Sequence, residues 1–337
     1  MSTDSRGAPS FSIRFDLRRP EFATASSAEL AAAALDMSAW ADRNGFLAVI
    51  LSEHHGSPDG YMPSPMVMAG AVAARTERIG ISLAAMIAPL HDPIRLAEDI
   101  AMIDVISGGR VMPIVAAGYV ETEFAAFGRT LRDRGPVMDE ICGFLDQAWR
   151  GESFEWQGRT VRVTPRPVQQ PRPPILMGGS TRVAARRAAK HADWFVPSTP
   201  ECFEMYREEL RKLGKPDPGP QAPSLPMFVH VAEEPEAAWE RIASHALHET
   251  NAYGKWMAEA GLGGPYEVFE DAAELRRSEK YLVLTPDEMI ERCRALGAAG
   301  NVTIHPLMGG LDPELGWENL HLLEQRVLPA LRGTGGT

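Results

Sequence analysis

The chain has 337 residues, 45% hydrophobic and 23% charged, with a formal net charge of −11 and a pI near 5.4. This composition supplies enough apolar material for a large core and excludes disorder of the whole chain. A nucleic-acid-binding protein needs a basic stripe that neutralises phosphates, and this acidic sequence has none. No run approaches the roughly 18 apolar residues of a membrane span, so we expect no transmembrane helix.

The cysteines indicate a reducing compartment. Cys142, Cys202 and Cys293 lie far apart and form neither a C-x-x-C motif nor a zinc-binding spacing. An odd and sparse cysteine count is typical of proteins that keep free thiols. Residues 1–11 lack the apolar segment of a signal peptide. We therefore expect a cytoplasmic protein without a metal site.

Short β-rich segments alternate with amphipathic helical segments along the chain. The predicted strands are residues 11–17, 46–55, 79–87, 110–118, 173–179, 193–198, 227–232 and 301–307. The predicted helices are residues 27–44, 66–76, 93–106, segments up to 149, 181–191, 201–213, a long region after 232, and 317–331. The strands are almost continuously apolar, as parallel strands buried on both faces are. Eight strand–helix units predict a (β/α)8 TIM barrel, with a doubly wound sheet as the alternative.

Two stretches interrupt this alternation. Residues 152–174 are polar, β-prone and rich in proline, which predicts a hairpin turning near Gln157 and Gly158 and then an extended arm. Residues 251–284 are irregular and rich in glycine and charge. Long irregular segments in a compact fold are usually lids or mobile loops, with surface padding as the alternative. We expect one domain over residues 1–337, with these two insertions and an ordered core over 10–332.

The second predicted strand ends in Ser52, Glu53, His54 and His55. Catalytic groups of a parallel barrel lie at the C-terminal ends of its strands. Adjacent side chains of a strand point to opposite sides, so only one of the two histidines can face the mouth of the barrel. That histidine is a candidate acid, base or hydrogen-bond donor, with a structural histidine held by a carboxylate as the alternative. No third ligand for zinc stands nearby.

Two further strand ends have the composition of a cofactor site. The third strand ends in small residues that include Ala84 and Ala85, which would admit a flat ring, although tight packing explains them equally. The fifth strand runs directly into a predicted helix through Gly178, Gly179, Ser180 and Thr181. Glycine allows a phosphate to approach the backbone, and the start of a helix offers free N–H groups, although an ordinary helix cap has the same residues. Positive charge follows at Arg182, Arg186 and Arg187.

Other cofactor motifs are absent from the sequence. No G-x-G-x-x-G follows a strand, and neither a P-loop nor a G-x-S-x-G nucleophile motif occurs. This pattern favours a metal-free cofactor with a phosphate tail over zinc, ATP or acyl-enzyme chemistry. Candidate residues of a partly apolar substrate pocket, each of which could equally fill the core, are Tyr61, Met62, Trp156, Tyr253 and Trp256.

Five segments of the chain resemble the bacterial luciferase-like monooxygenases. They are SEHH at 52–55, RTERIGISLAAMIAPLHDPIRLAEDIAMIDVISGGR at 75–110, GYVETEFAAFG at 118–128, ILMGGST at 175–181 and PLMGGLDPELGWENLHLLEQRVLPAL at 306–331. The resemblance extends from residue 11 to residue 331, and only residues 251–284 match poorly. It implies a TIM barrel that binds reduced FMN or, in a sister branch of the family, the deazaflavin coenzyme F-420.

The resemblance also implies roles for single residues. His54 matches the catalytic histidine of luciferase-type members, and a non-proline cis peptide bond is implied at Ala84–Ala85. The implied phosphate loop is Gly178, Gly179 and Ser180, with Thr181 beside it. At the fourth strand the chain departs from luciferase, because Ala116, Ala117 and Gly118 stand where luciferase has an arginine beside the phosphate. This departure argues against light emission with a long-chain aldehyde, and Gly118 joins the candidate cofactor contacts.

Three functions follow as alternatives. The first is a monooxygenase that uses reduced FMN and O2 to oxygenate a small organic substrate. Because no nicotinamide-binding motif is present, its flavin would be reduced by a separate NAD(P)H-dependent reductase. The second is an F-420-dependent hydride-transfer oxidoreductase. The third is a flavin-binding protein without chemistry, against which the pair His54 and His55 argues. The resemblance further implies a homodimer formed through the helices at 66–76 and 93–106.

Overall fold

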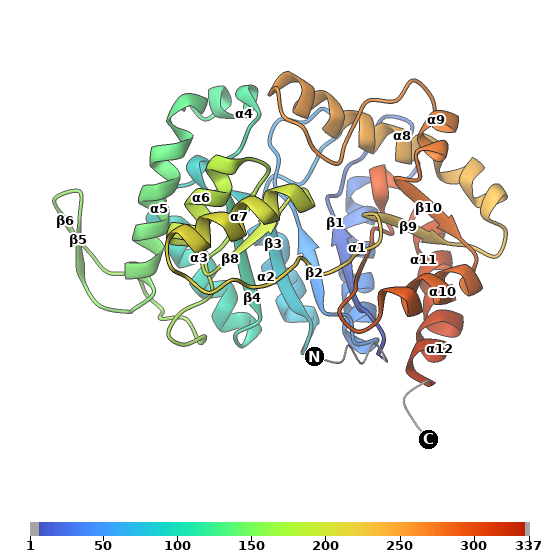
Figure 1. The fold of residues 1–337 in the computed structure, drawn as a ribbon, viewed down its shortest axis with the longest axis horizontal. Helices are drawn as coiled ribbons and strands as arrows, with labels where there is room; N and C mark the ends of the chain where they lie inside the picture. Colours follow the sequence, from blue (N-terminus) through green and yellow to red (C-terminus); the bar gives the residue numbers. More distant parts are fainter. Residues whose placement is uncertain (1–6, 334–337) are drawn as a thin grey trace.

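Seven of the eight predicted strands form one parallel sheet in the computed structural model, which describes residues 7–333 (Figure 1). These strands are β1 (Ser10–Phe15), β2 (Ala48–Leu51), β3 (Gly80–Ile87), β4 (Val111–Ala116), β7 (Leu176–Gly179), β8 (Trp194–Pro197) and β11 (Asn301–Ile304). They lie in the order β11-β1-β2-β3-β4-β7-β8. The first strand of the chain therefore pairs with the last, and the other neighbours follow the chain order, as in a barrel.

The remaining predicted strand lies outside this ladder. β9 (Phe228–Val231) pairs in parallel with β10 (Tyr281–Leu284), and Ser224 forms a single bridge with Asn301 of β11. Within residues 7–333 no strand pairing joins β8 to β9. The structure thus has an α/β fold with a curled parallel sheet, a half-barrel. The closed eight-stranded barrel stays a prediction.

Helices cover the outer face of the sheet. The helices that pack side by side, in this spatial order, are α11 (Pro313–Leu322), α1 (Ser27–Arg43), α2 (Pro65–Arg75), α3 (Pro93–Ser107), α5 (Arg134–Ala148), α6 (Arg182–His191) and α7 (Pro200–Lys212). Two others, α4 (Glu121–Ala126) and α8 (Pro235–Glu259), lie at the end of the molecule opposite α12 (Leu328–Arg332) (Figure 1). The helical set is completed by α9 (Ala272–Arg277) and α10 (Pro286–Leu296).

Local signals of the sequence explain where the first helix begins and ends. Ser26 is the N-cap of α1, and with Glu29 it forms a reciprocal capping box. After the helix, Gly45 adopts a φ of 76°, which a glycine reaches without steric cost. The helix then presents Leu30, Ala34 and other apolar residues to the core.

The predicted hairpin in the first insertion is confirmed. β5 (Phe154–Trp156) and β6 (Arg159–Val161) pair antiparallel, and both residues of the turn, Gln157 and Gly158, have positive φ. The arm that follows is anchored to α3, because a carboxylate oxygen of Asp104 accepts the backbone N–H groups of Val168 and Gln169 at 2.6 and 3.0 Å.

The second insertion is more regular than the sequence predicts, and that prediction is wrong for much of residues 251–284. Residues up to Glu259 continue α8, residues 272–277 form α9, and residues 281–284 form β10. Gly254 suggests a break in the helix, but a Cβ at this position would lie 2.7 Å from the backbone of Glu267. The glycine therefore permits close approach of the following segment to an unbroken helix.

Other expectations concern the chain as a whole. No helix among residues 7–333 is long and apolar enough to cross a membrane. Cys142, Cys202 and Cys293 are buried and unpaired. The expectation that the N-terminal segment is no signal peptide falls largely on residues 1–6, which lie outside the described residues.

Candidate active site

His54 lies three residues after β2, at the C-terminal edge of the sheet, and a carboxylate holds its ring. Its Nδ1 forms a 2.8 Å hydrogen bond with Oε1 of Glu123, which is buried on α4. The same oxygen accepts the backbone N–H of His55 at 2.9 Å. Because Nδ1 is held in this way, the orientation of the ring is fixed and Nε2 is the nitrogen left for chemistry.

His55 points to different partners, as the alternation of side chains predicts. Its Nε2 contacts Glu53 Oε1 at 2.8 Å, and His91 contacts the same oxygen at 2.8 Å. The other oxygen of Glu53 accepts the backbone N–H of Ile87 at the end of β3, also at 2.8 Å. Burial raises the pKa of Glu53, but the hydrogen bonds with His55 and His91 outweigh it and lower the pKa to about 2. The carboxylate of Glu53, bonded to His55, thus links the segment after β2 to the end of β3.

Aromatic rings enclose His54. Trp256 of α8 stacks on its imidazole with ring centroids 4.3 Å apart. The rings of Tyr61, Tyr119 and Tyr253 present their edges at 4.9, 5.8 and 5.9 Å. Tyr61 and Tyr253 are also joined by a 2.6 Å hydrogen bond between their hydroxyl groups. The surroundings of His54 are therefore dry and mostly aromatic.

Three of the five predicted pocket residues thus come together, and the other two have different places. Trp156 lies in the β5–β6 hairpin and packs against Phe144 with ring centroids 4.8 Å apart, far along the chain from this site. Met62 is buried, and its carbonyl accepts the backbone N–H of His54 at 3.3 Å. Trp156 is therefore core filling, and Met62 supports the loop that carries the histidine.

Arg18 is a residue of this enclosure that the sequence analysis missed. Its guanidinium lies over the rings of Tyr61, Tyr253 and Trp256, at 4.5, 4.6 and 4.9 Å from their centroids. One nitrogen pairs with Asp59 at 2.5 Å, whereas Nε and Nη2 are buried without a hydrogen-bond partner. The signal that could have identified Arg18 in the sequence is that a charged arginine stands shortly after a buried strand. Glu123 was missed as well, although it lies in the segment GYVETEFAAFG.

Small residues line the adjoining strand ends. The predicted cis peptide bond at Ala84–Ala85 is present. A Cβ added to Gly178 would lie 3.5 Å from that of Ala85 and 3.8 Å from that of Ala116, so these three residues from neighbouring strands adjoin one another. Gly118 adopts a φ of 75°, and a Cβ there would lie 2.6 Å from Ile87. Gly178, Ala85 and Ala116 thus form a wall with little side-chain bulk, which would suit a flat ring.

The turn from Gly178 to Thr181 joins β7 to α6 and fits a phosphate. Thr181 is the N-cap, and its hydroxyl accepts the N–H of Ala184 at 3.2 Å. A Cβ at Gly179 would lie 2.4 Å from that of Ala184, so glycine is required for the chain to enter the helix. The helix has four basic residues besides His191 and no acidic residue, and its first-turn N–H groups and dipole attract anions. Ser180 lies half-buried within this turn.

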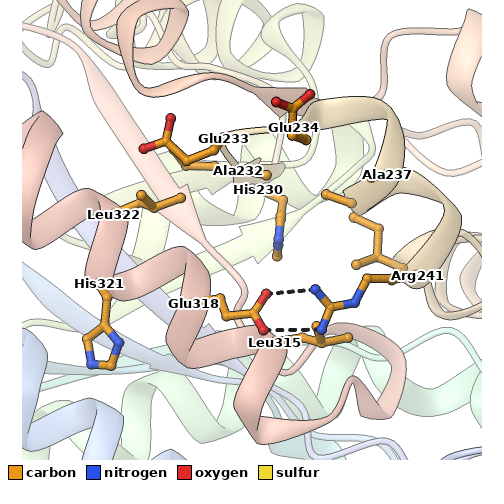
Figure 2. Close-up of a pocket in the computed structure, with 13 residues that line it drawn as sticks. His230, Ala232, Glu233, Glu234, Ala237, Arg241, Leu315, Glu318, His321 and Leu322 are labelled. Carbon is orange, nitrogen blue, oxygen red and sulfur yellow. Dashed lines mark hydrogen bonds and ion pairs between the residues drawn. The ribbon is translucent and has the colours of Figure 1, made fainter.

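A separate pocket of about 460 Å³ lies between α8 and α11 beside β9 (Figure 2). His230 points toward the ion pair of Arg241 and Glu318, whose two contacts measure 2.8 and 3.1 Å. Burial lowers the pKa of His230 to about 4. None of the residues predicted for the site lines this pocket. The geometry around His54 is therefore the better candidate for an active site.

Comparison with known proteins finds relatives that depend on two different cofactors, FMNH(2) and F420. The family model described as luciferase-like monooxygenase matches residues 15–303. An FMNH(2)-dependent dimethylsulfone monooxygenase from Pseudomonas putida is 28% identical over 284 residues, which cover 78% of this chain and 77% of the relative. An F420-dependent glucose-6-phosphate dehydrogenase from Microbacterium testaceum is 26% identical over 322 residues, covering 88% and 93%.

The fold is shared with solved structures. The oxygenating constituent of 3,6-diketocamphane monooxygenase from Pseudomonas putida, in complex with FMN, has a TM-score of 0.72 at 18% identity, covering 96% of this chain and 98% of that chain. The chain spans about half the length of two further curated relatives, both from Sinorhizobium fredii. Flavin-dependent monooxygenases and F420-dependent oxidoreductases are thus both among the relatives.

Proposed function

Because this chain belongs to the luciferase-like monooxygenase family, we propose that it is an oxidoreductase that uses reduced FMN and O2 to oxygenate a small organic substrate. The observation that carries the proposal is the buried pair of His54 and Glu123, set in an aromatic enclosure at the edge of the sheet where the small-residue wall also lies. An ordinary structural histidine requires no such enclosure.

The residues present fit the cofactor. Gly178, Ala85 and Ala116 carry little side-chain bulk where a flat ring system would lie, and the turn from Gly178 to Thr181 would hold its phosphate through backbone N–H groups. Reduced FMN, when bound, supplies the electrons with which O2 is activated. The chain itself provides the orientation of the ring and the exclusion of water.

His54 is the group that would hold or move a proton. Glu123 occupies Nδ1, so Nε2 is the atom that exchanges a proton with the reacting groups. Tyr61, Tyr253 and Trp256 surround the ring. These aromatic walls keep bulk water away from the reaction.

An F-420-dependent hydride-transfer oxidoreductase is the second candidate. The match to the Microbacterium testaceum dehydrogenase favours it, because that match covers 93% of the relative, whereas the match to the dimethylsulfone monooxygenase covers 77%. The same wall and phosphate turn would accept a deazaflavin.

We also infer that a separate NAD(P)H-dependent reductase supplies the reduced flavin. The sequence has no G-x-G-x-x-G turn between a strand and a helix, and the diketocamphane relative is itself named an oxygenating constituent. Protein mixed with FMN and NAD(P)H should oxidise NAD(P)H no faster than a protein-free control. Rapid and saturable consumption by this chain alone would contradict a two-component system.

Fluorescence titration with FMN, FAD and F-420 tests the function directly. His54→Ala should retain the affinity of the wild-type protein for its cofactor and lose turnover by about 10²–10⁴-fold, because one acid–base group contributes this much. His321→Ala, which changes an exposed histidine on α11, is the matched control.

Gly178→Asp should weaken cofactor binding, and Gly143→Asp, on the exposed face of α5, should not. Turnover that persists without O2 and requires F-420 would replace the first candidate by the second.

A further inference from the structure

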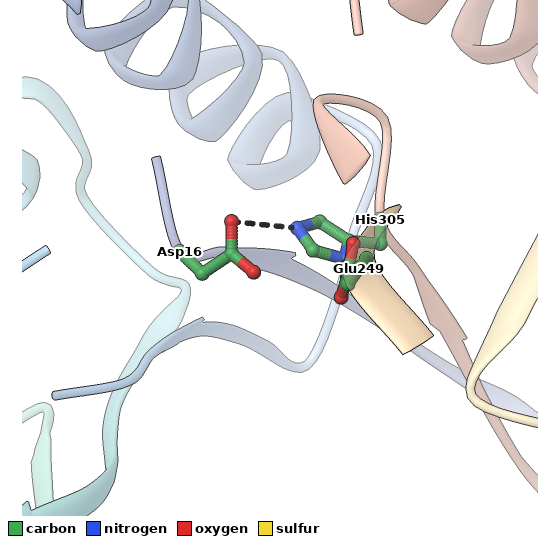
Figure 3. Close-up of side chains that lie close together, drawn as sticks. All are labelled: Asp16, Glu249 and His305. Atoms are coloured by element: carbon green, nitrogen blue, oxygen red, sulfur yellow. Dashed lines mark ion pairs between the residues drawn. The ribbon is translucent and has the colours of Figure 1, made fainter. Parts of the chain in front are cut away.

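His305 lies between two buried carboxylates that come from different parts of the fold (Figure 3). It follows β11, whereas Asp16 follows β1 and Glu249 belongs to α8. Its Nε2 is 3.7 Å from Asp16 Oδ1, and its Nδ1 is 3.3 Å from Glu249 Oε1. The exposed fraction is 1% for the side chain of His305 and 0% for both carboxylates.

These three side chains have an unusual number of polar atoms without a hydrogen bond. Both ring nitrogens of His305, both carboxylate oxygens of Glu249 and Oδ2 of Asp16 are buried and unpartnered. Buried polar groups normally have partners, because an unpaired one loses its hydration without compensation. Electrostatic attraction between opposite charges is the compensation that remains at these distances.

Asp, Glu and His are also ligands of divalent cations, and the three side chains offer ligand atoms within 4.8 Å of one another. The orientation argues against a metal. A histidine binds a metal through one ring nitrogen, whereas here each nitrogen faces a different carboxylate. Two N–H groups directed at two carboxylates are what a protonated ring presents.

Two arginines adjoin the carboxylates that face His305. Arg18 Nε is 3.5 Å from Asp16 Oδ2, and Arg14 Nη1 is 3.8 Å from Glu249 Oε1. The other titratable groups nearby are His230 of β9, Tyr253 of α8, Tyr266, and Tyr281 of β10. Burial lowers the pKa of His230 to about 4 and raises the pKa of Tyr266 to about 12, so both are neutral at pH 7. His248 faces Asp59 at 2.8 Å and not His305.

We propose that His305 is a positioning residue whose imidazolium joins Asp16 to Glu249 and thereby holds the C-terminal half of α8 over His54. Tyr253 and Trp256 follow Glu249 at spacings of four and seven residues, which place all three on one face of the helix. Tyr253 is bonded to Tyr61 and to Arg14, and Trp256 stacks on His54. We call the contacts of His305 with Asp16 and Glu249 the clamp. The clamp follows from the distances between these side chains, whereas its effect on substrate rests on the proposed function.

The clamp predicts a particular pH dependence of stability. Burial lowers the pKa of His305, but Glu249 and Asp16 outweigh it and raise the pKa to about 9. A histidine whose pKa is raised on folding stabilises the fold fully below its unfolded pKa of about 6.5. That contribution is lost as the pH rises through about 9. The Tm of the wild-type protein should therefore exceed that of His305→Gln at pH 6.5, and the difference should disappear by pH 10.

Hydrogen exchange at pH 7 tests the positioning of the helix. In His305→Gln, and in Glu249→Gln as a second variant of nearly unchanged size, amides of residues 249–259 should exchange roughly tenfold faster, while those of α11 keep the wild-type rate. His321→Gln, which changes an exposed histidine, is the control for both measurements. Carbon-13 chemical shifts of the histidine rings should show one buried imidazolium at pH 7 that is absent from His305→Gln.

Three results would overturn the proposal. They are unchanged exchange of residues 249–259 in both folded variants, a neutral His305 ring at pH 7, and a stoichiometric metal ion whose removal by a chelator lowers the Tm of the wild-type protein only. None of these readouts uses flavin. A protein that binds no flavin but shows the expected exchange would therefore contradict the proposed function and leave the clamp intact.

Discussion

Glu123 is the residue on which the orientation of His54 depends. Replacing it by glutamine keeps the size of the side chain but removes the negative charge beside Nδ1. Supporting groups of this kind typically contribute about 10–100-fold, so turnover of Glu123→Gln should fall by that factor while cofactor affinity stays unchanged. Steady-state kinetics and the fluorescence titration measure the two effects separately.

Glu121 offers the matched control for this substitution. It lies on the same short helix, but its side chain is exposed. Glu121→Gln should have wild-type kinetics. Equal turnover of Glu123→Gln and the wild-type protein would show that the carboxylate does not act on His54.

Glu53 should make the stability of the protein depend on acid pH. Its carboxylate links His55, His91 and the end of β3, and its pKa is lowered from 4.5 to about 2. A lowered pKa contributes stability above the unfolded value, and the contribution is lost as the pH falls from 4.5 toward 2. Glu53→Gln should therefore cost on the order of 3 kcal/mol at pH 7 and much less near pH 2.5.

Thermal unfolding across this pH range checks the prediction. Glu77→Gln, an exposed residue between α2 and β3, should keep the wild-type profile. A constant difference in Tm between Glu53→Gln and the wild-type protein from pH 7 to pH 2.5 would mean that the charge of Glu53 contributes nothing.

At the scale of elements, the arm after the β5–β6 hairpin depends on Asp104. This buried carboxylate of α3 accepts two backbone N–H groups and the side-chain amide of Gln169. Asp104→Ala leaves the two backbone N–H groups without this partner, at a cost of about 1–3 kcal/mol for each that stays buried, whereas the Gln169 amide keeps its hydrogen bond to the carbonyl of Val111. The Tm should fall, and trypsin should cleave sooner after Arg162, the exposed arginine between β6 and the arm. Asp99→Ala, which breaks a surface pair with Arg95 on the same helix, should cause neither change.

The elements predicted from the sequence are those with a local signal. The apolar strands and the turn at Gln157 depend on residues close in the chain, and the structure confirms them. The C-terminal part of α8 was missed, because Gly254 and the charges around it suggest a loop while tertiary packing keeps the helix intact. β10 was missed for a similar reason, since its partner β9 lies about fifty residues earlier.

In the candidate site, too, residues with a local signal in the sequence could be predicted and their distant partners could not. His54, Ala85 and Gly178 could be selected because each stands at the end of a predicted strand. The partners of His54 could not, because Glu123 lies 69 residues away in the chain and Trp256 belongs to a segment with no recognisable periodicity. Contacts between distant segments leave no trace in a single sequence unless a charge or a small residue stands out, as Arg18 does after β1.

At the scale of the whole molecule, α2 and α3 are a candidate interface between two copies of the chain. These neighbouring helices expose apolar side chains, among them Val67 at 75% and Ile106 at 49% exposed. Exposed apolar side chains that gather on neighbouring helices are typical of interaction sites. Val67→Asp combined with Ile106→Asp should convert a dimer into a monomer in light scattering. Val268→Asp, at a comparably exposed valine elsewhere, should leave the dimer intact, and a monomeric wild-type protein would contradict the interface.

Among residues 7–333, β8 pairs with β7 on one side and with no strand on the other, and this open edge bears on how the protein behaves when it is concentrated or heated. An edge strand offers free N–H and C=O groups to any other extended chain, and apolar side chains beside them make the addition of a foreign strand favourable. β8 has such side chains, because Trp194 is 43% and Val196 is 36% exposed. Pro197 shortens the available ladder, since it has no N–H to donate. Aggregation should therefore begin at this edge, ahead of global unfolding, and a lysine at position 196 is the substitution most suited to suppress it.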